Sequence, residues 1–224
     1  MKGHYNIAID GPSGAGKSTI AKMLAEKLGI MYLDTGALYR AIGLKAYRDG
    51  WPEDDKTVAE LLRGVSVTVD CDPATGRQRV YLDGQDVTGR IREHRVSKAA
   101  SDISAVPCVR YKMVELQREI ASRCDTVLDG RDIGTFVLPN AEYKIFLTAS
   151  VAERARRRYE ELKAKGEDCT LESITADIEK RDYNDSHRAL APLRKADDAV
   201  EIDTTDLTIE EVADKLTALI GGKQ

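Results

Sequence analysis

Residues 5–18, Tyr-Asn-Ile-Ala-Ile-Asp-Gly-Pro-Ser-Gly-Ala-Gly-Lys-Ser, decide the fold class of this chain. The apolar run at their start predicts a short buried strand, and the glycine-rich segment after it predicts a tight turn. Apolar residues then recur every three or four positions from Ile20 to Leu28, as on one face of a helix, and Gly29 is placed to end that helix. A strand, a glycine turn and a helix in this order predict an α/β layer fold with a parallel sheet.

The alternation of short apolar runs and helical patterns continues along most of the chain. A helical pattern spans about 35–49, and Pro107 is placed to open another helix. The patterns Ser-x-x-Glu at 150–153 and Thr-x-x-Glu at 208–211 are capping boxes, which predict two further helix starts. We predict strands at 30–33, 126–129, 143–147 and 199–202, and helices at about 107–120, 150–165, 171–182 and 208–220.

The rhythm changes between about 63 and 95, where period-two patterns replace helical ones. Valines alternate with polar residues over 65–69, and 79–82 reads as a second strand after turn residues at 72–76. This pattern predicts a small antiparallel meander inserted into the α/β frame. We therefore expect a core formed by 1–62 and 96–224, and an inserted subdomain at 63–95.

The composition is that of an ordinary globular domain, with 224 residues, 42% hydrophobic and 32% charged, and a net charge of −4. This charge balance argues against a general nucleic-acid coat or a polybasic membrane contact. No stretch approaches the roughly 18 apolar residues of a membrane span. We expect no nucleic-acid partner, no membrane partner and, since coiled-coil heptads are absent from an acidic chain, a monomer.

The cysteines and the first residues bear on the compartment. The apolar run of the first predicted strand stops at Asp10, so a secretion signal is not expected. The 4 cysteines are scattered and form no Cys-x-x-Cys pair, which argues against a zinc knuckle or a redox dithiol. Scattered thiols fit a reducing compartment, and we expect a cytoplasmic protein.

Residues 11–18 fit the pattern G-x-x-x-x-G-K-S/T between a predicted strand and a predicted helix, which is the context of a phosphate-binding loop. Glycines let backbone N–H groups surround a phosphate, and the helix N-terminus adds partial positive charge. A glycine turn without a ligand would not explain Lys17, which we expect to reach the β- and γ-phosphates, or Ser18, whose hydroxyl we expect to bind Mg²⁺. No Asn-Lys-x-Asp guanine motif is present, so ATP is the expected nucleotide. The predicted ATP-binding residues of the loop are Gly11, Pro12, Ser13, Gly14, Ala15, Gly16, Lys17, Ser18 and Thr19.

A second polar group, Asp-Gly-Arg-Asp at 129–132, follows a predicted buried strand. Strand carboxyl ends face the ligand crevice of an open α/β sheet. We therefore expect Asp129 to hold Mg²⁺ through water, and Arg131 and Asp132 to point toward a second substrate. The alternative is a turn with a local ion pair.

Two arginine-rich segments complete the candidate chemistry. Four arginines at 154–158 fit either a solvated helix face or a closing lid that neutralises a transferring phosphoryl group. A lid would also exclude water from the reaction. The charged segment 181–188 fits either a surface network or a clamp on a ribose and a phosphate.

Several of these motifs together resemble one family, the bacterial cytidylate (CMP) kinases within the nucleoside monophosphate kinases. The resemblance runs in order over nearly the whole chain. Its most specific parts are the phosphate loop and the string Gly-Arg-Asp-Ile-Gly-Thr at 130–135. The other matching segments are 33–40, 100–101, 109–110, 144–147, 181–188 and 191–193.

The resemblance implies an activity and an architecture. The implied reaction is ATP + CMP ⇌ ADP + CDP, with dCMP also accepted and Mg²⁺ required. The implied fold is the P-loop NTPase fold, a central parallel sheet flanked by helices, in which the insert at 63–95 binds the monophosphate. A helical lid at about 150–168 would carry Arg154, Arg156, Arg157 and Arg158.

The resemblance also implies roles for single residues. Ser101, Arg110 and Asp132 would read the cytosine edge, and the chemistry agrees, because a carboxylate accepts from the N4 amino group and a guanidinium donates to N3 and O2. Uracil offers an acceptor at O4, which Asp132 would repel. The implied CMP-binding set is Thr35 (Ser in some members), Tyr39, Arg40, Ser101, Arg110, Arg131, Asp132, Arg181, Asp185 and Arg188, with Asp185 on the ribose and Arg40, Arg131, Arg181 and Arg188 on the phosphate. The catalytic candidates are Lys17, Arg131, Arg158 and Arg188, and Arg157 is a further ATP-binding candidate.

Other functions remain as alternatives. Shikimate and dephospho-coenzyme A kinases share the phosphate loop, but the string at 129–135 and the inserted meander argue against them. A UMP-preferring enzyme is a closer variant. A non-catalytic nucleotide sensor would not need the lid arginines and two further carboxylate–arginine groups, and a structural scaffold would leave all of these motifs unexplained.

Overall fold

The computed structural model describes residues 4–52, 54–72 and 77–221. The chain forms two compact units, the first made of the segments up to Tyr32 and from Cys124 onward, and the second of Leu33–Arg123. We call them unit 1 and unit 2. The strand β2 (Met31–Asp34) passes from one to the other. No helix of the described residues is long and apolar enough to cross a membrane.

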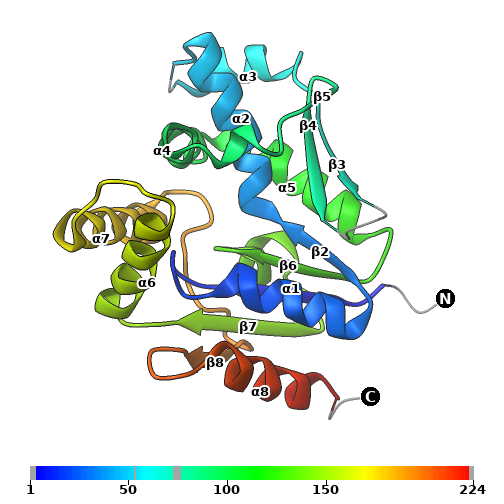
Figure 1. The fold of residues 1–224 in the computed structure, drawn as a ribbon. Helices are drawn as coiled ribbons and strands as arrows, with labels where there is room; N and C mark the ends of the chain where they lie inside the picture. Colours follow the sequence, from blue (N-terminus) through cyan, green and yellow to red (C-terminus); the bar gives the residue numbers. More distant parts are fainter. Residues whose placement is uncertain (1–3, 53, 73–76, 222–224) are drawn as a thin grey trace. The chain divides into compact units, whose positions relative to one another are not determined.

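Unit 1 is built on a five-stranded sheet in the order β2-β6-β1-β7-β8 (Figure 1). The pairs β1–β6, β1–β7 and β7–β8 are all parallel. Helical crossovers link successive strands, as parallel pairing requires. Besides β2, the elements of unit 1 are β1 (Asn6–Asp10), α1 (Lys17–Leu28), β6 (Thr126–Gly130), β7 (Tyr143–Thr148), α6 (Val151–Ala164), α7 (Leu171–His187), β8 (Val200–Asp203) and α8 (Ile209–Gly221).

The core of unit 1 lies between the sheet and the helices α1 and α8. Ile7 and Ile9 of β1 are fully buried and share one apolar cluster with Ile20 of α1 and Leu216 of α8. These strands read as continuous apolar runs because helices cover the sheet. Gly29 ends α1 in a left-handed conformation, as the sequence predicts.

The helices α6 and α7 pack against each other through a small apolar cluster that includes Ala155, Leu162, Ile174 and Ile178. The prediction that α7 ends near Asp182 is wrong, because the helix continues to His187. No glycine or proline interrupts 183–187, so nothing local stops the helix there. The extension places Asp185 on the helix and Arg188 at its C-terminal cap.

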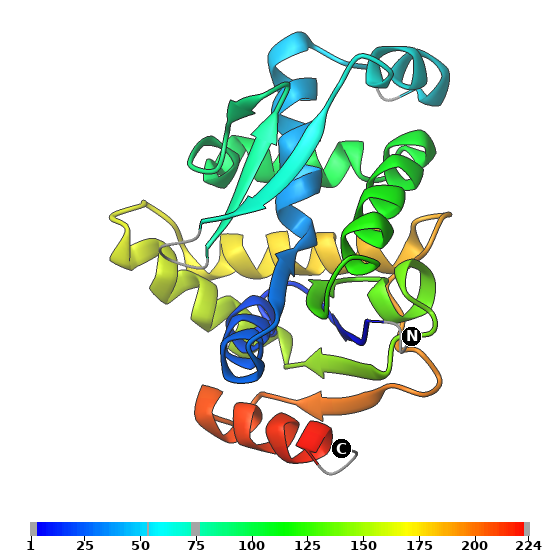
Figure 2. The same cartoon turned by 90° about the vertical axis from the view of Figure 1, so that its right-hand side faces the viewer.

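Unit 2 packs helices against a three-stranded antiparallel sheet in the order β3-β4-β5. Figure 2 shows the two longer strands beside α2. At Gly43 of α2, a Cβ would come within 2.6 Å of the backbone nitrogen of Ala100, so only glycine allows α2 and α4 to pack this closely. The elements are α2 (Thr35–Asp49), α3 (Asp55–Leu62), β3 (Val67–Cys71), β4 (Gln78–Leu82), β5 (Gln85–Asp86), α4 (His94–Ile103) and α5 (Pro107–Ala121), with a short 3₁₀ turn at Arg90–Arg92.

The predicted fold class is confirmed: a central parallel sheet is flanked by helices, and a small antiparallel sheet accompanies it. The meander β3–β5 falls inside the predicted insert 63–95, but unit 2 is larger than that insert and begins at Leu33. The sequence patterns gave no prediction for α3 and α4. Residues 73–76 of the predicted turn lie outside the described residues.

Candidate functional site

The glycine-rich loop between β1 and α1 has the backbone that a phosphate cradle needs. Gly11 has φ 146°, and a Cβ at this position would overlap the carbonyl oxygen of Leu147 in β7. Gly14 has φ 81°, and a Cβ there would lie 3.0 Å from Cβ of Arg154 in α6. Both positions therefore require glycine, because of the conformation and of the close approach of neighbouring elements.

Lys17 is the first residue of α1, and its side chain is folded back over the loop. Its ammonium donates to the carbonyl of Pro12 at 2.6 Å, and the residue is only 5% exposed. Burial holds the pKa of Lys17 well below its usual value, and the nearby charge of Arg131 adds to this effect. The carboxylates of Asp129 and Asp185 act in the opposite direction.

The carboxylate of Asp129 accepts hydrogen bonds from two hydroxyl groups. Ser18 donates to Oδ2 at 2.7 Å, and Tyr32 of β2 donates to Oδ1 at 2.8 Å. The sequence analysis assigns Ser18 and Asp129 to one Mg²⁺ site, whereas their direct hydrogen bond and the contact with Tyr32 were not predicted. Hydroxyl and carboxylate oxygens are ligands that suit Mg²⁺, which is usually bound by one or two protein groups and substrate phosphates. Within the described residues, no group of three or more His, Cys, Asp or Glu side chains could form an all-protein cage.

Asp10, the last residue of β1, connects the phosphate loop to the turn after β6. Its carboxylate oxygens accept from the backbone N–H groups of Ile133 and Gly134, each at 2.7 Å. Burial raises the pKa of Asp10 to about 6, although these two hydrogen bonds act against the rise. The residue lies inside the quoted motif, but its contact with 133–134 depends on the pairing of β1 with β6 and was not predicted.

Two ion pairs join the turn after β6 to the end of α7. Arg131 donates to Asp185 at 2.8 Å, and Arg188 donates to Asp132 at 3.0 Å. Burial alone would raise the pKa of Asp185, but the charge and hydrogen bond of Arg131 outweigh it and lower the pKa. The field of Arg181, also on α7, acts on Lys17 and Asp185. The structure thus brings these unit 1 candidates together beside the phosphate loop.

The four arginines of α6 differ in their surroundings. Arg154 is buried and donates to Ser13 O at 3.1 Å and to Asp182 at 2.7 Å, so it connects the phosphate loop to α7. Arg156 and Arg158 are exposed and pair with glutamates of the same helix.

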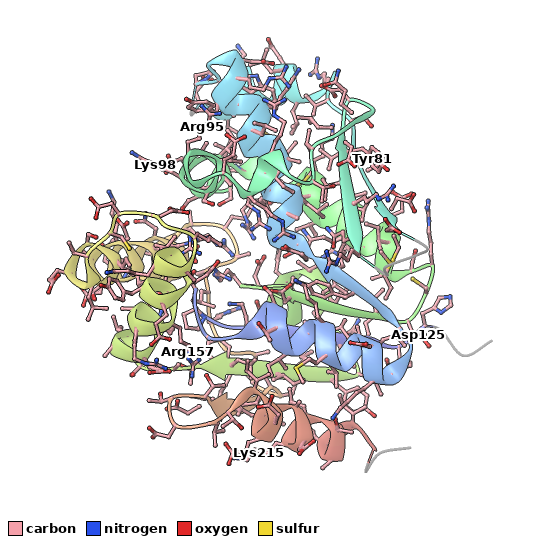
Figure 3. All side chains as sticks on the ribbon, in the orientation of Figure 1. Tyr81, Arg95, Lys98, Asp125, Arg157 and Lys215 are labelled. Carbon is pink, nitrogen blue, oxygen red and sulfur yellow. The ribbon has the colours of Figure 1, made fainter. Side chains whose placement is uncertain are left out.

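Arg157, labelled in Figure 3, donates to the carbonyl and the hydroxyl of Thr204 at 2.6 and 3.1 Å. The Thr204 hydroxyl in turn lies 3.4 Å from the carbonyl of Ala15, so this arginine is connected to the phosphate loop through one side chain. Glu153 also accepts from Arg157, and its hydrogen bonds with Arg156 and Arg157 lower the pKa of Glu153 to about 2. Thr204 was not predicted and has no sequence signal beyond its place after a strand.

The remaining CMP-binding candidates belong to unit 2. The guanidinium carbon of Arg110 lies 5.6 Å from the ring centre of Tyr39, and Arg110 is only 1% exposed. Arg110 also donates weakly to Ser104 O at 3.4 Å, and Ser104 donates to the carbonyl of Ser101 at 2.8 Å. The other two candidates lie at the start of α2.

Asp34 caps the N-terminus of α2. Its Oδ1 caps α2 by accepting from the backbone N–H of Ala37, and its Oδ2 accepts from Arg40 at 2.7 Å. Gln78 of β4 contacts both the N–H and the carbonyl of Asp34, at 2.7 and 3.3 Å. Thr35 is buried directly beside this cap. The meander therefore supports the helix that carries Thr35 and Arg40.

Comparisons with known proteins show the family to which the chain is similar. A family model described as cytidylate kinase matches residues 7–221. The chain is 52% identical to the cytidylate kinase of Caldicellulosiruptor bescii over 215 residues, which cover 96% of this chain and 94% of that protein. It is 51% identical to the cytidylate kinase of Lactobacillus johnsonii over 219 residues, which cover 97% of this chain and 94% of that protein.

Among solved structures, an uncharacterized protein from Eubacterium ventriosum matches with a TM-score of 0.52 at 14% identity. The match covers 98% of this chain and 99% of that one. At this identity the likeness concerns the fold alone.

Proposed function

Because the chain belongs to the cytidylate kinase family, we propose that it transfers the γ-phosphoryl group of ATP to CMP, and to dCMP, giving ADP and CDP or dCDP. The observation that carries this proposal is the grouping in unit 1 of a phosphate loop, a hydroxyl–carboxylate pair and two carboxylate–arginine pairs. A site for a nucleoside triphosphate and its metal ion needs only the first two of these features. The arginine pairs are what a second, anionic substrate needs.

The donor side uses the loop Gly11–Thr19. Its backbone amides and the N-terminus of α1 bind the phosphates of ATP, and Lys17 moves from the Pro12 carbonyl to the β- and γ-phosphates. Arg157 contributes to ATP binding from α6. Arg158 reaches the transferring group as an exposed arginine of the lid at about 150–168.

Mg²⁺ is the cofactor that fits the oxygen atoms of Ser18 and Asp129. The Ser18 hydroxyl donates a hydrogen bond to Asp129, so the lone pairs of its oxygen would be left for the metal. Bound Mg²⁺ neutralises charge that develops on the phosphates. Asp129 acts through a water molecule.

The acceptor side uses the residues that the family resemblance implies. Asp132 accepts from the amino group of cytosine, Arg110 donates to its ring acceptors, and Ser101 adds a further contact, while the insert 63–95 supports this side. Asp185 holds the ribose, and Thr35, Tyr39 and Arg40 of α2 contribute to the same nucleotide. Arg131, Arg181 and Arg188 bind its phosphate, which requires Arg131 and Arg188 to share or leave their carboxylate partners.

The chemistry needs no covalent intermediate. An oxygen of the CMP phosphate is already anionic, so it attacks the γ-phosphorus directly and no strong general base is required. Catalysis then consists of alignment and of charge neutralisation by Lys17, Arg131, Arg158 and Arg188. An arginine contact of this kind raises kcat on the order of 10³-fold or more.

A panel of acceptors tests the proposal. The chain is incubated with ATP, Mg²⁺ and one of CMP, dCMP, UMP, AMP, GMP or shikimate, and ADP release is followed by a coupled assay. We expect CMP and dCMP to give the highest kcat/KM. Preference for UMP or shikimate would assign a different acceptor, and ATP binding without turnover of any acceptor would indicate a nucleotide sensor. We also propose a cytoplasmic monomer, which size-exclusion chromatography with light scattering tests for the oligomeric state.

A further inference from the structure

The hydroxyl of Tyr32 is the second donor to the carboxylate of Asp129. It donates to Oδ1 at 2.8 Å, while Ser18 donates to Oδ2 at 2.7 Å. The two donors come from different elements, β2 and α1, and Asp129 lies on β6, the strand next to β2 in the sheet. Each of the two carboxylate oxygens thus accepts a hydrogen bond from a hydroxyl group.

A single hydrogen bond would not fix this carboxylate. The terminal torsion of an aspartate is broad, so a carboxylate held at one oxygen can rotate about its Cβ–Cγ bond. A second donor on the other oxygen removes this freedom. The proton of Ser18 then keeps one direction, and so do the lone pairs that the serine oxygen presents.

The ring of Tyr32 has an independent structural role. It packs partly buried against the core of unit 1 and lies 5.7 Å from the ammonium of Lys22. Phenylalanine would keep these ring contacts. The hydroxyl is therefore separable from the ring in an experiment.

We propose that Tyr32 is a positioning residue for Mg²⁺, because its hydroxyl orients Asp129 and, through it, Ser18. The inference rests on the proposed function only in taking Ser18 and Asp129 as the groups that face the metal. In this proposal Tyr32 acts through Asp129 and does not itself bind the metal. Residues that orient metal-binding groups typically change metal affinity by about 10- to 100-fold when they are removed.

The test compares Tyr32→Phe with the wild type. ADP binding is measured by isothermal titration calorimetry with Mg²⁺ and with EDTA, without any acceptor or turnover. We expect the gain in ADP affinity that Mg²⁺ provides to fall by about tenfold in the variant, whereas the affinity in EDTA stays within about twofold. In turnover assays, the Mg²⁺ concentration for half-maximal rate rises by a similar factor, and the KM for CMP at saturating Mg²⁺ is unchanged.

The matched control is Tyr143→Phe. Tyr143 is in the same unit and donates its hydroxyl to the carbonyl of Ile220 at 3.2 Å, away from the loop. This variant should behave as the wild type in both assays, and thermal melting should show both variants folded.

Three results would overturn the proposal. One is an unchanged Mg²⁺ dependence in Tyr32→Phe. Another is an equal loss of ADP affinity with Mg²⁺ and with EDTA, which would mean general damage to the loop. The third is an equal effect of Tyr143→Phe. If the wild type phosphorylates no monophosphate, the proposed function fails, but the calorimetry still decides the role of Tyr32.

Discussion

The guanidinium of Arg188 donates to the carboxylate of Asp132 at 3.0 Å, and the two side chains are only 9% and 7% exposed. The contact joins the C-terminal cap of α7 to the turn after β6. It places a group proposed to bind the acceptor phosphate next to the group proposed to recognise the base. If both proposed roles hold, this ion pair couples recognition of the base electrostatically to binding of the phosphate.

Asp132→Asn should change the choice of pyrimidine. The carboxamide is a poorer acceptor for the cytosine amino group, and its own N–H₂ can donate to O4 of uracil. We expect kcat/KM for CMP to fall by about 10- to 100-fold, which corresponds to the loss of one hydrogen bond to a charged group. The ratio of CMP to UMP turnover measures this effect, and Asp198→Asn, at an exposed carboxylate, is the control. An unchanged ratio would remove Asp132 from base recognition.

Lys17→Ala should stop turnover without unfolding the protein. We expect kcat to fall by about 10³-fold or more, because charge neutralisation on the β- and γ-phosphates is lost. The unfolding midpoint should not drop, since burial of the ammonium already lowers the pKa of Lys17 and so disfavours its charge in the fold. Lys27→Ala, on the same helix and exposed, should keep normal activity. Near-normal activity of the Lys17 variant would refute the assignment of the phosphate loop.

Asp10 should make stability fall as pH rises from about 4 to 6. Its pKa in the folded protein is raised to about 6 from 3.8, so in this window the folded state keeps a proton that the unfolded chain has lost. The raised pKa therefore favours folding at low pH, and this advantage is gone above pH 6. We expect the free energy of unfolding of the wild type relative to Asp10→Asn to be more favourable at pH 4.5 than at pH 7, by on the order of 2 kcal/mol.

Urea unfolding of both proteins at the two pH values measures this difference. Asp198→Asn is a control of opposite sign, because the hydrogen bond with Lys144 lowers the pKa of Asp198 and stabilises the fold only above the pKa of the free carboxyl group. An equal difference between wild type and Asp10→Asn at both pH values would mean that Asp10 titrates as an ordinary carboxyl group.

Arg157→Ala should weaken ATP binding. Thr204 holds this arginine and lies 3.4 Å from the Ala15 carbonyl, so the guanidinium is kept beside the loop. We expect the KM for ATP to rise by about tenfold, as for the loss of a hydrogen bond to a charged partner, with a smaller change for CMP. Arg156→Ala is the matched control, since Arg156 pairs only with Glu153 and Glu160 in the contacts described above. Equal effects of the two substitutions would assign both arginines to the helix surface.

The local signals in the sequence predict several element boundaries in both units. The glycine loop, the proline at the start of α5 and the cap at Thr208 each act within a few residues, and the structure has all of them. Helices without such start or stop residues were harder to predict. The pattern 171–182 has no stop signal at its end, and α4 carries mostly polar and small residues.

The members of the candidate site could be proposed from motifs, but their mutual contacts could not. Arg131 and Asp185 are separated by 54 positions, and Tyr32 and Asp129 by 97. Which hydroxyl meets which carboxylate depends on the order of parallel strands and on the turn of α7, and these are fixed by the packing of the whole unit. The sequence alone therefore suggested substrate contacts for residues that here also bind one another.

The close approach of Gly11 to the carbonyl of Leu147 has a consequence for how this protein can evolve. The phosphate loop contacts the backbone of β7 at Leu147 and not one of its side chains. A side-chain substitution in β7 therefore leaves the contacting atoms in place. The strand can exchange its outward residues freely while the distance from sheet to cradle stays constant. At this contact only Gly11 must keep its identity, so side-chain substitutions in β7 need not change the geometry of the phosphate loop.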